Sequence, residues 1–300
     1  MTQPPGAVAH YNLLERLEPA GPGELYRARD TRLGRTVSVR LLPPEFVPEG
    51  EARAALLARV RSVAALSHPN ITALFDVGEH QGGIYVVYEF LQGQTLRAEM
   101  AGRMMNVRRA VELTIQMADA IADAHAAGFV HGGLSPDSIA VTARGHVKIP
   151  AFELAAHGGF DEEDGAVRLR DYDSPEEARG QPTDERSNIY SVGAVLFEML
   201  TTRRPLHRGA AAPSVSNRHV PPELDDIVLK AVAPNPDFRC QSAAAFAAEL
   251  RSVAAILDVR GGAGDEVEHA EPAGAHVGRA LVLTIVILLV LGTLAWLMLT

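Results

Sequence analysis

The side chains best suited to acid–base or metal chemistry gather in two short stretches, 131–139 and 147–153. The first reads H-G-G-L-S-P-D-S-I and the second reads V-K-I-P-A-F-E. A carboxylate in such a stretch could accept a proton or hold Mg²⁺. We nevertheless interpret Asp137, and the acidic run at 161–164, as solvated loop charges, because charged runs usually face water.

Other kinds of site are poorly supported. The 11 histidines show no H-E-x-x-H or similar spacing, and the single cysteine, Cys240, excludes an intramolecular disulfide and a thiolate zinc cluster. The net charge of -9 disfavours general nucleic-acid binding. We therefore predict no metal site and no nucleic-acid partner.

The elements that must position these stretches change in type along the chain. Short runs typical of strands dominate the first third, with one helix at Gly50–Leu66, and the predicted strands are Tyr11–Leu17, Leu25–Ala28, Thr36–Leu42, Ala73–Glu79 and Ile84–Glu89. Helical periodicity then takes over, and the predicted helices are Val107–Ala127, Ser187–Leu200, Pro221–Ala233 and Ser242–Leu257. The helix at Ser187–Leu200 is apolar nearly all round, which is typical of a buried central helix. The pattern predicts an α+β fold with a small β-rich part, 11–91, and a larger helical part, 95–257.

The two ends of the chain have a different composition. Residues 1–10 are rich in proline and glycine and are predicted to be disordered, and 258–279 is predicted to be a flexible linker. Residues 280–299 read ALVLTIVILLVLGTLAWLML, without a charge. A helix of that length spans about 30 Å, the thickness of the bilayer hydrocarbon, so we predict a transmembrane helix in preference to a buried core helix. Because Arg279 flanks this segment, we expect a single-pass membrane protein with its N-terminal domain in the cytoplasm.

The stretch 131–139 resembles the catalytic loop of protein kinases, H-R-D-L-x-x-x-N, and other motifs follow in the family's order. Residues 84–96 resemble the hinge between the kinase lobes, Ser174-Pro175-Glu176 resembles A-P-E, and Asn235–Arg239 supplies the arginine that pairs with that glutamate in the family. The chain is therefore similar to bacterial serine/threonine protein kinases over residues 11–257. The resemblance implies a two-lobed protein kinase-like fold, with a C-terminal single transmembrane helix after it.

The residues that react in kinases are replaced in this chain. Gly133 stands at the position of the catalytic Asp and Ser138 at that of the metal-binding Asn. Arg40 stands at the phosphate-binding Lys, Arg59 at its Glu partner, and Ala151 at the metal-binding Asp of D-F-G. The Asp usual at the start of the central helix is Asn188, and Glu153 lies two residues too late to replace the lost metal ligand.

The framing residues are kept. His131, Phe152, Glu176 and Arg239 are expected to be structural, with Glu176 and Arg239 forming a buried bridge. Only Gly23 matches a glycine of the family's phosphate-binding loop. The resemblance implies a vestigial nucleotide pocket formed by Gly23, Arg40, Tyr88, Glu89 and Leu91.

Four parts of the phosphoryl-transfer machinery are thus altered together, and positioned charge supplies most of that catalysis. We therefore expect a catalytically inactive, membrane-anchored pseudokinase. It would act as a scaffold or regulator by binding a protein partner, either an active kinase or a cell-envelope complex, and no cofactor is expected. The alternatives are a nucleotide-binding sensor and an atypical serine/threonine kinase with residual ATP-dependent phosphotransfer, and ATP with Mg²⁺ would bind only under these.

Overall fold

The computed structural model describes residues 6–17, 23–47, 49–150, 170–205 and 209–268, without the side chains of 170 and 260–268. The chain divides into two compact units, Met1–Ala254 and Ala255–Thr300. All sites discussed below lie in the first unit.

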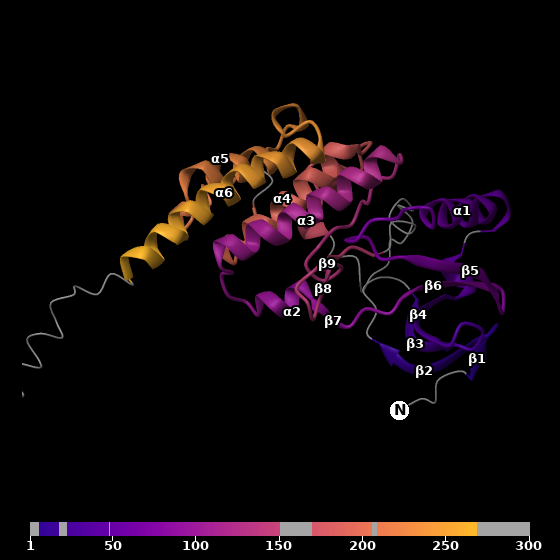
Figure 1. Ribbon diagram of the computed structural model, residues 1–300. Coiled ribbons are helices and arrows are strands. Elements are labelled where there is room, and N and C mark those ends of the chain that lie inside the picture. Colours follow the sequence, from indigo (N-terminus) through magenta and orange to yellow (C-terminus); the bar gives the residue numbers. More distant parts are fainter. Residues whose placement is uncertain (1–5, 18–22, 48, 151–169, 206–208, 269–300) are drawn as a thin grey trace, which may run out of the picture. The chain divides into compact units, whose positions relative to one another are not determined.

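The N-terminal lobe is an antiparallel sheet with the strand order β1-β2-β3-β4-β6-β5 (Figure 1). Its strands are β1 (Ala7–Val8), β2 (Tyr11–Leu17), β3 (Glu24–Asp30), β4 (Arg35–Leu42), β5 (Leu74–His80) and β6 (Gly83–Glu89). One helix, α1 (Gly50–Val63), lies between β4 and β5 in the chain. Successive side chains of a strand point to opposite faces, so Val37 and Val39 join one hydrophobic core with Val87 of β6, while Arg40 lies on the other face.

The start of the chain differs from the prediction. Residues 6–10 are not disordered, because β1 pairs with β2 and Val8 is fully buried in the core of the sheet. The hydroxyl and the backbone N–H of Thr31 both donate hydrogen bonds to the carbonyl of His10, at 2.8 and 3.1 Å. The prediction weighed the proline and glycine content and overlooked one apolar side chain that the sheet can bury. The remainder of the predicted disordered segment, 1–5, lies outside the described residues.

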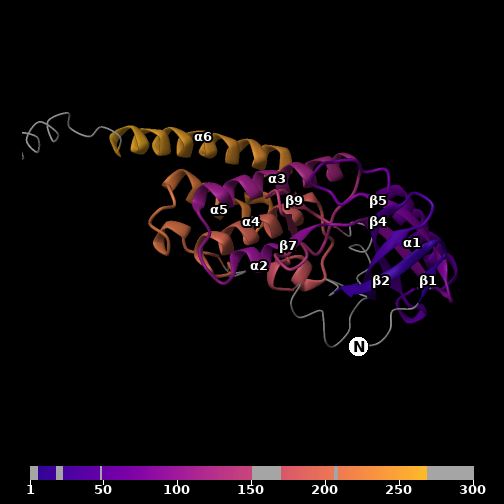
Figure 2. The same cartoon turned by 60° about the horizontal axis from the view of Figure 1, so that its bottom comes forward.

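The C-terminal lobe is mainly helical (Figures 1 and 2). Its helices are α2 (Leu96–Met100), α3 (Val107–Ala126), α4 (Glu185–Thr201), α5 (Pro222–Ala231) and α6 (Ala243–Glu268), and a small sheet pairs β7 (Gly93–Thr95), β8 (Ala140–Thr142) and β9 (Val147–Lys148). Short 3-10 helices lie in this lobe at Arg170–Tyr172, Glu177–Arg179, Pro213–Val215 and Pro236–Phe238, and in the N-terminal lobe at Pro44–Phe46. Every residue of α4 from Ser187 to Thr201 is buried, so the prediction of a central buried helix is confirmed.

The last described helix is longer than expected. The predicted linker, 258–279, is helical over its first part, because α6 continues to Glu268. Extending an existing helix adds one hydrogen bond per residue without a new nucleation step, so an amphipathic pattern is not required there. The rest of the predicted linker and the apolar segment 280–299 lie outside the described residues. Among the helices that the structure describes, none is long and apolar enough to cross a membrane.

Candidate nucleotide site and catalytic loop

His131 anchors the loop 131–139 at its first residue. Its backbone N–H donates to Oδ1 of Asn188 on α4 at 2.8 Å, and its Nε2 lies 2.8 Å from the carbonyl oxygen of Pro150. Burial lowers the pKa of His131 to about 4. The ring is therefore neutral near pH 7 and donates Nε2–H to the Pro150 carbonyl, which is a structural role.

The two residues after His131 have a backbone that suits glycine. Gly132 has φ of +43° and Gly133 has φ of +148°, both in a region that side-chain-bearing residues rarely adopt. A Cβ atom at Gly133 would meet no other atom within 4 Å, so space is available and the backbone angle is the obstacle. A side chain at Gly133 would thus be strained by the backbone angle, although the surrounding space would admit it.

Ser138 does not offer its hydroxyl to a metal ion in this loop. Its Oγ accepts a hydrogen bond from the backbone N–H of Ser135 at 3.0 Å. The same Oγ lies 3.0 Å from the carbonyl oxygen of Ser135 and 3.3 Å from that of Gly133. The hydroxyl therefore closes the turn internally, which a serine side chain does readily.

Asn188 of α4 holds the first residue of the loop. Its Oδ1 accepts from His131 and lies 3.1 Å from Nε2 of His125, which is also buried. Its Nδ2 has no hydrogen-bond partner among the described residues, although the side chain is fully buried. An amide offers one acceptor oxygen where a carboxylate offers two, so Asn188 has fewer acceptor sites for the loop than an aspartate would have.

Arg40 and Arg59 are the residues that the sequence predicts at the positions of an oppositely charged pair in kinases. Arg40 is 4% exposed in the middle of β4, between Leu25 of β3 and Val86 of β6. The guanidinium carbon of Arg59, on α1, lies 5.8 Å from the ring centroid of Phe129, and its charge helps to lower the pKa of His131. Two guanidinium groups repel each other and cannot form the ion pair of an active kinase.

The hinge segment has the expected position and a side-chain contact that was not expected. Tyr88 is buried in β6, and Leu91 follows it, partly buried. The carboxylate of Glu89 binds Nζ of Lys148 on β9 at 2.5 Å and accepts from the backbone N–H of Ala73 at 2.9 Å. The side chain of Glu89 is therefore engaged within the protein, which leaves the hinge backbone as the part able to meet a purine.

Gly23 has a structural explanation. Its φ is +79°, and a Cβ atom there would lie 2.1 Å from the carbonyl oxygen of Leu41. The close approach of β3 to β4 therefore requires glycine whether or not a phosphate binds. The rest of the expected phosphate-binding loop, 18–22, lies outside the described residues, as do Ala151, Phe152 and Glu153.

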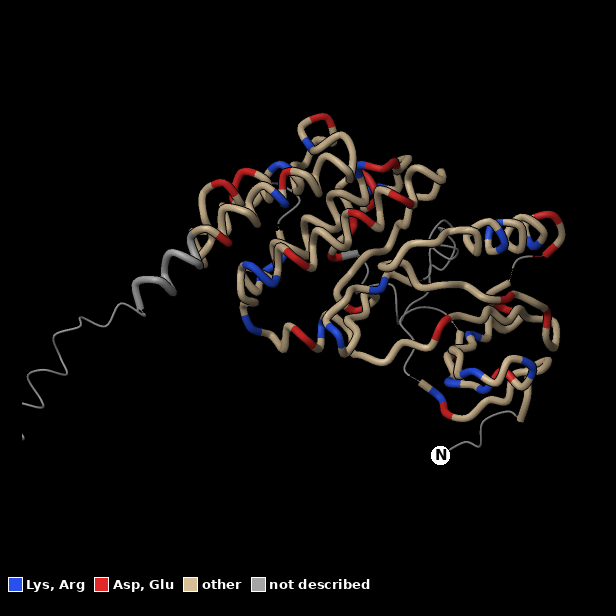
Figure 3. Tube along the Cα trace, viewed as in Figure 1, with Lys and Arg blue, Asp and Glu red and all other residues tan. Residues whose placement is uncertain are grey.

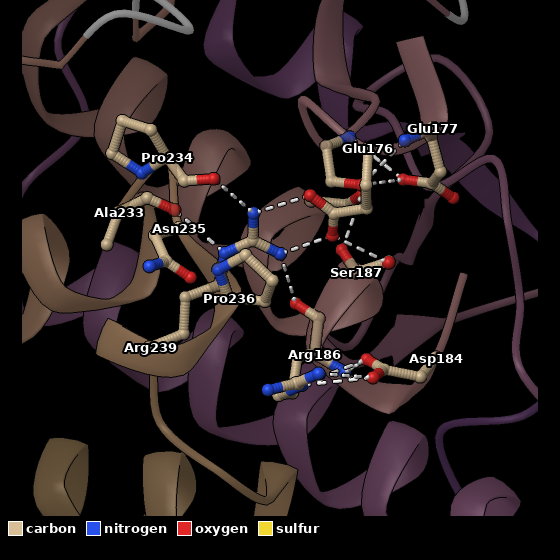
Figure 4. A network of polar contacts seen from close by, with 12 residues as sticks. Glu176, Glu177, Asp184, Arg186, Ser187, Ala233, Pro234, Asn235, Pro236 and Arg239 are labelled. Carbon is tan, nitrogen blue, oxygen red and sulfur yellow. Dashed lines mark hydrogen bonds and ion pairs between the residues drawn. The ribbon is translucent and has the colours of Figure 1, made fainter. Parts of the chain in front are cut away.

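The expected bridge between Glu176 and Arg239 is present (Figure 4). Two guanidinium nitrogens of Arg239 contact the two carboxylate oxygens of Glu176 at 2.5 and 2.7 Å, and Ser187 of α4 donates to the same carboxylate at 2.8 Å. Arg239 also donates to the carbonyls of Ala233 and Arg186. Although burial opposes it, hydrogen bonding from Arg239 and Ser187 lowers the pKa of Glu176 to about 2.

A second polar network escaped the sequence analysis. Arg97 of α2 donates to Glu198 of α4 at 2.6 Å and to the hydroxyl of Tyr172, which itself donates to Glu198. Arg97 also binds Asp137 at 3.2 Å, and the Asp137 side chain, 36% exposed, therefore forms an ion pair while it remains partly open to solvent. These residues lie far apart in the sequence and carry no shared motif, so no sequence signal pointed to the network.

The motifs, the two lobes and the Glu176–Arg239 bridge define a protein kinase domain. Comparison with protein-family models gives the same result, since the model "Protein kinase domain" matches residues 14–247. The chain therefore belongs to the protein kinase family.

The similar proteins are bacterial serine/threonine kinases. A probable serine/threonine-protein kinase of Streptomyces coelicolor is 35% identical over 266 residues, covering 81% of this chain and 40% of that protein. PknB of Mycobacterium tuberculosis strain H37Rv is 34% identical over 274 residues, covering 83% of this chain and 44% of PknB. The chain thus spans less than half the length of these relatives. The crystal structure of the M. tuberculosis PknI kinase domain shares the fold, with a TM-score of 0.68 at 21% identity over 82% of this chain and 98% of that one.

Proposed function

We propose that this chain is a pseudokinase, a kinase-shaped binding module that does not transfer phosphate. The observation that carries the proposal is the backbone of the catalytic loop. Gly132 and Gly133 have φ of +43° and +148°, and no carboxylate stands at the position of the base. A kinase needs that carboxylate to orient the substrate hydroxyl.

Two further features support the loss of catalysis. The hydroxyl of Ser138 is engaged inside the loop, where a kinase presents an amide oxygen to Mg²⁺. Arg40 and Arg59 replace a lysine and a glutamate, which removes the ion pair that fixes the phosphate-binding cation. Each change alone could be compensated, but together they affect the catalytic base, a ligand of the metal ion and the contact with the phosphates.

The preserved packing supports a role in binding. A buried ion pair is costly to keep unless its geometry is good, and the Glu176–Arg239 pair is bidentate, with Ser187 as a third partner. The fold around the altered loop is therefore held in shape. We propose that this surface binds a protein partner, either an active kinase or a cell-envelope complex, as a scaffold or a regulator.

The anchoring part of the proposal comes from the sequence. Residues 280–299 contain no charge and are long enough to cross a bilayer as a helix. An anchor would hold the module near the membrane and raise its effective concentration for partners there. We propose a single-pass protein with the kinase-like domain in the cytoplasm.

A thermal-shift measurement tests whether the chain binds ATP, which phosphate transfer would require. The full chain in detergent micelles should show no rise in melting temperature when ATP is added, with or without Mg²⁺ or Mn²⁺. A concentration of about 5 mM is suitable, because ligand well above its dissociation constant gives a clear shift. A rise that requires the metal would contradict the proposal. Labelled-ATP transfer to the chain or to a generic protein substrate would then separate a sensor from an enzyme.

The alternative function is a nucleotide sensor or an atypical serine/threonine kinase. One observation favours it: the hinge strand β6 keeps its pairing to β4, and the Glu89 side chain is turned to Lys148, so the hinge backbone is left for a purine. The names of the similar proteins, all kinases, agree with this alternative as well. A shift with ATP that is independent of metal, without transfer of label, would identify the sensor.

A further inference from the structure

Three chain segments meet at the last turn of α4. The loop before α3 reaches it through Met105, whose backbone N–H donates to the carbonyl of Met199 at 2.8 Å. The segment before α5 reaches it through Asn217, whose side-chain amide donates to the carbonyl of Leu200 at 3.0 Å. The third segment, 202–205, leaves α4 directly. We call the exposed surface of 101–105, 202–205 and 209–219 the α4-end surface.

This surface carries positive charge in an acidic chain. Its three segments contain four arginines, Arg103, Arg203, Arg204 and Arg218, and no aspartate or glutamate, whereas the whole chain has a net charge of -9. All four arginines are exposed. Arg204 pairs with Asp171, but no side chain in the described part of the protein forms an ion pair with the other three. Three positive charges are thus available to an anionic partner.

Exposed apolar side chains lie among these arginines. Met104 is 45% exposed and directly follows Arg103, and Val215 is 76% exposed three residues before Arg218. Basic side chains interleaved with apolar ones are typical of surfaces that rest on a membrane, because the arginines meet the headgroups and the apolar groups enter the interface.

The course of the chain indicates which partner meets this surface. Within the first unit, α6 runs antiparallel to α3, and Arg251 of α6 binds Asp119 of α3 at 2.5 Å (Figures 1 and 2). From Ala243 to Ala254 it therefore heads toward the end of α3 that begins at Val107, where the α4-end surface lies and where Lys and Arg are visible in blue (Figure 3). The apolar segment 280–299 follows α6 in the sequence.

We propose that the α4-end surface docks on the anionic headgroups of the membrane in which the chain is anchored. This inference rests on the anchoring proposed above and adds an orientation, with the C-terminal lobe against the lipid and the N-terminal lobe away from it. Each arginine near an anionic surface strengthens binding roughly fivefold, so three arginines act together as a useful second contact beside the anchor.

Hydrogen–deuterium exchange of the full chain in lipid nanodiscs tests the proposal. Backbone amides of 101–105 and 213–219 should exchange more slowly in discs containing phosphatidylglycerol than in discs of phosphatidylcholine alone. The double variant Arg103→Glu/Arg218→Glu should lower the ratio of docked to undocked molecules by at least roughly 25-fold and abolish the difference. High salt should act in the same direction, because it screens exposed charges.

The control variant carries the same change of charge on the other lobe. Arg32→Glu/Arg61→Glu reverses the charge of two exposed arginines of the N-terminal lobe and should leave the lipid-dependent protection intact.

If protection is equal in both kinds of disc, or is lost equally in both double variants, the docking proposal is overturned while anchoring stands. If the wild-type chain does not enter the discs at all, anchoring fails first and the docking proposal fails with it. Binding of an acidic protein to the same surface, without lipid-dependent protection, would assign the arginines to a protein partner and also overturn the proposal.

Discussion

At the scale of single residues, the loop 131–139 is unusual in its main chain as well as in its side chains. Gly133 lacks a carboxylate, which the sequence reveals, and has a φ of +148°, which it does not. The conformation matters because it decides whether a side chain can simply be put back. At position 133 of this loop, a side chain cannot be restored without strain or a change in the backbone angle φ.

The variant Gly133→Asp tests this point. We expect no phosphate transfer, because Ala151 still lacks the carboxylate that holds Mg²⁺ in kinases, and a destabilisation of about 1–2 kcal/mol, because an aspartate is strained at this φ. Labelled-ATP transfer and urea unfolding measure the two effects. Gly128→Asp is a matched control for strain alone, since Gly128 also has a positive φ, of +81°, and a Cβ atom there would meet no other atom within 4 Å. Transfer by the Gly133→Asp protein would mean that the site is far more intact than we propose.

The Glu176–Arg239 bridge gives a second prediction at this scale. Glu176→Gln removes the charge that compensates Arg239, which is 2% exposed, and should lower the free energy of unfolding by about 3–5 kcal/mol. The corresponding fall in melting temperature is roughly 10 °C for a domain of this size. Asp119→Asn is the control, because its pair with Arg251 is exposed and should contribute less than about 1 kcal/mol. Equal effects of the two variants would show that burial does not strengthen the bridge.

The same carboxylate predicts a dependence on pH. Its pKa is about 2 in the folded protein and about 4.5 as a free side chain, so the folded state favours the ionised form. This stabilisation is complete above the unfolded pKa of about 4.5 and is lost as pH falls from there toward 2. Urea unfolding should therefore show that the free energy of unfolding falls between about pH 5 and pH 2, an interval that covers the two pKa values. The fall should be larger for the wild-type chain than for the Glu176→Gln variant. Parallel curves for the two proteins would contradict the assignment.

At the scale of elements, α4 organises the helical lobe. From one buried helix, Ser187 reaches Glu176, Asn188 reaches His131, and Ser191 donates to the carbonyl of Tyr172 at 2.9 Å. Three segments that flank or contain the altered site are thus tied to a single rigid support. This explains how the loop 131–139, whose two glycines leave it few side chains to pack, keeps a defined position.

The variant Asn188→Leu tests that role. It removes the acceptor used by the His131 backbone N–H and by the buried His125 ring, and each unsatisfied donor costs about 1–3 kcal/mol, so we expect a loss of about 2–4 kcal/mol. Ser191→Ala is the control, because it removes one hydroxyl donor and should cost about 1 kcal/mol. Urea unfolding gives both values. A loss for Asn188→Leu no larger than for Ser191→Ala would show that the loop is held elsewhere.

The elements also show how far the sequence could lead. The predicted strand Tyr11–Leu17 and the predicted buried helix around Ser187–Leu200 lie within a residue or two of β2 and α4, because strand and helix periodicity are local properties. The Glu176–Arg239 bridge was expected because motifs mark both residues. The Arg97–Tyr172–Glu198 network and the Lys148–Glu89 pair were missed, because they depend on how distant segments come together. The positive φ values at Gly132 and Gly133 were missed for the same reason.

At the scale of the whole molecule, the proposed anchor and the proposed docking surface would together restrict the orientation of the domain at the membrane. The sequence supplies the candidate anchor at 280–299, and the α4-end surface supplies a candidate second contact. Both the proposed anchoring and the proposed docking depend on which side of the membrane the domain occupies.

Protease protection in sealed vesicles tests on which side of the membrane the kinase-like domain lies. Arg279 directly precedes the apolar segment, and positively charged flanks stay in the cytoplasm, so residues after the segment should lie on the far side of the membrane. With the cytoplasmic face outward, protease should remove a tag placed before Met1 and leave a tag placed after Thr300 intact until detergent opens the vesicles. The variant Arg279→Glu should weaken this preference, since the flanking charge sets the orientation. Digestion of the C-terminal tag in intact vesicles would mean that 280–299 does not cross the bilayer in this direction, and would remove the physical basis for a cytoplasmic, membrane-docked module.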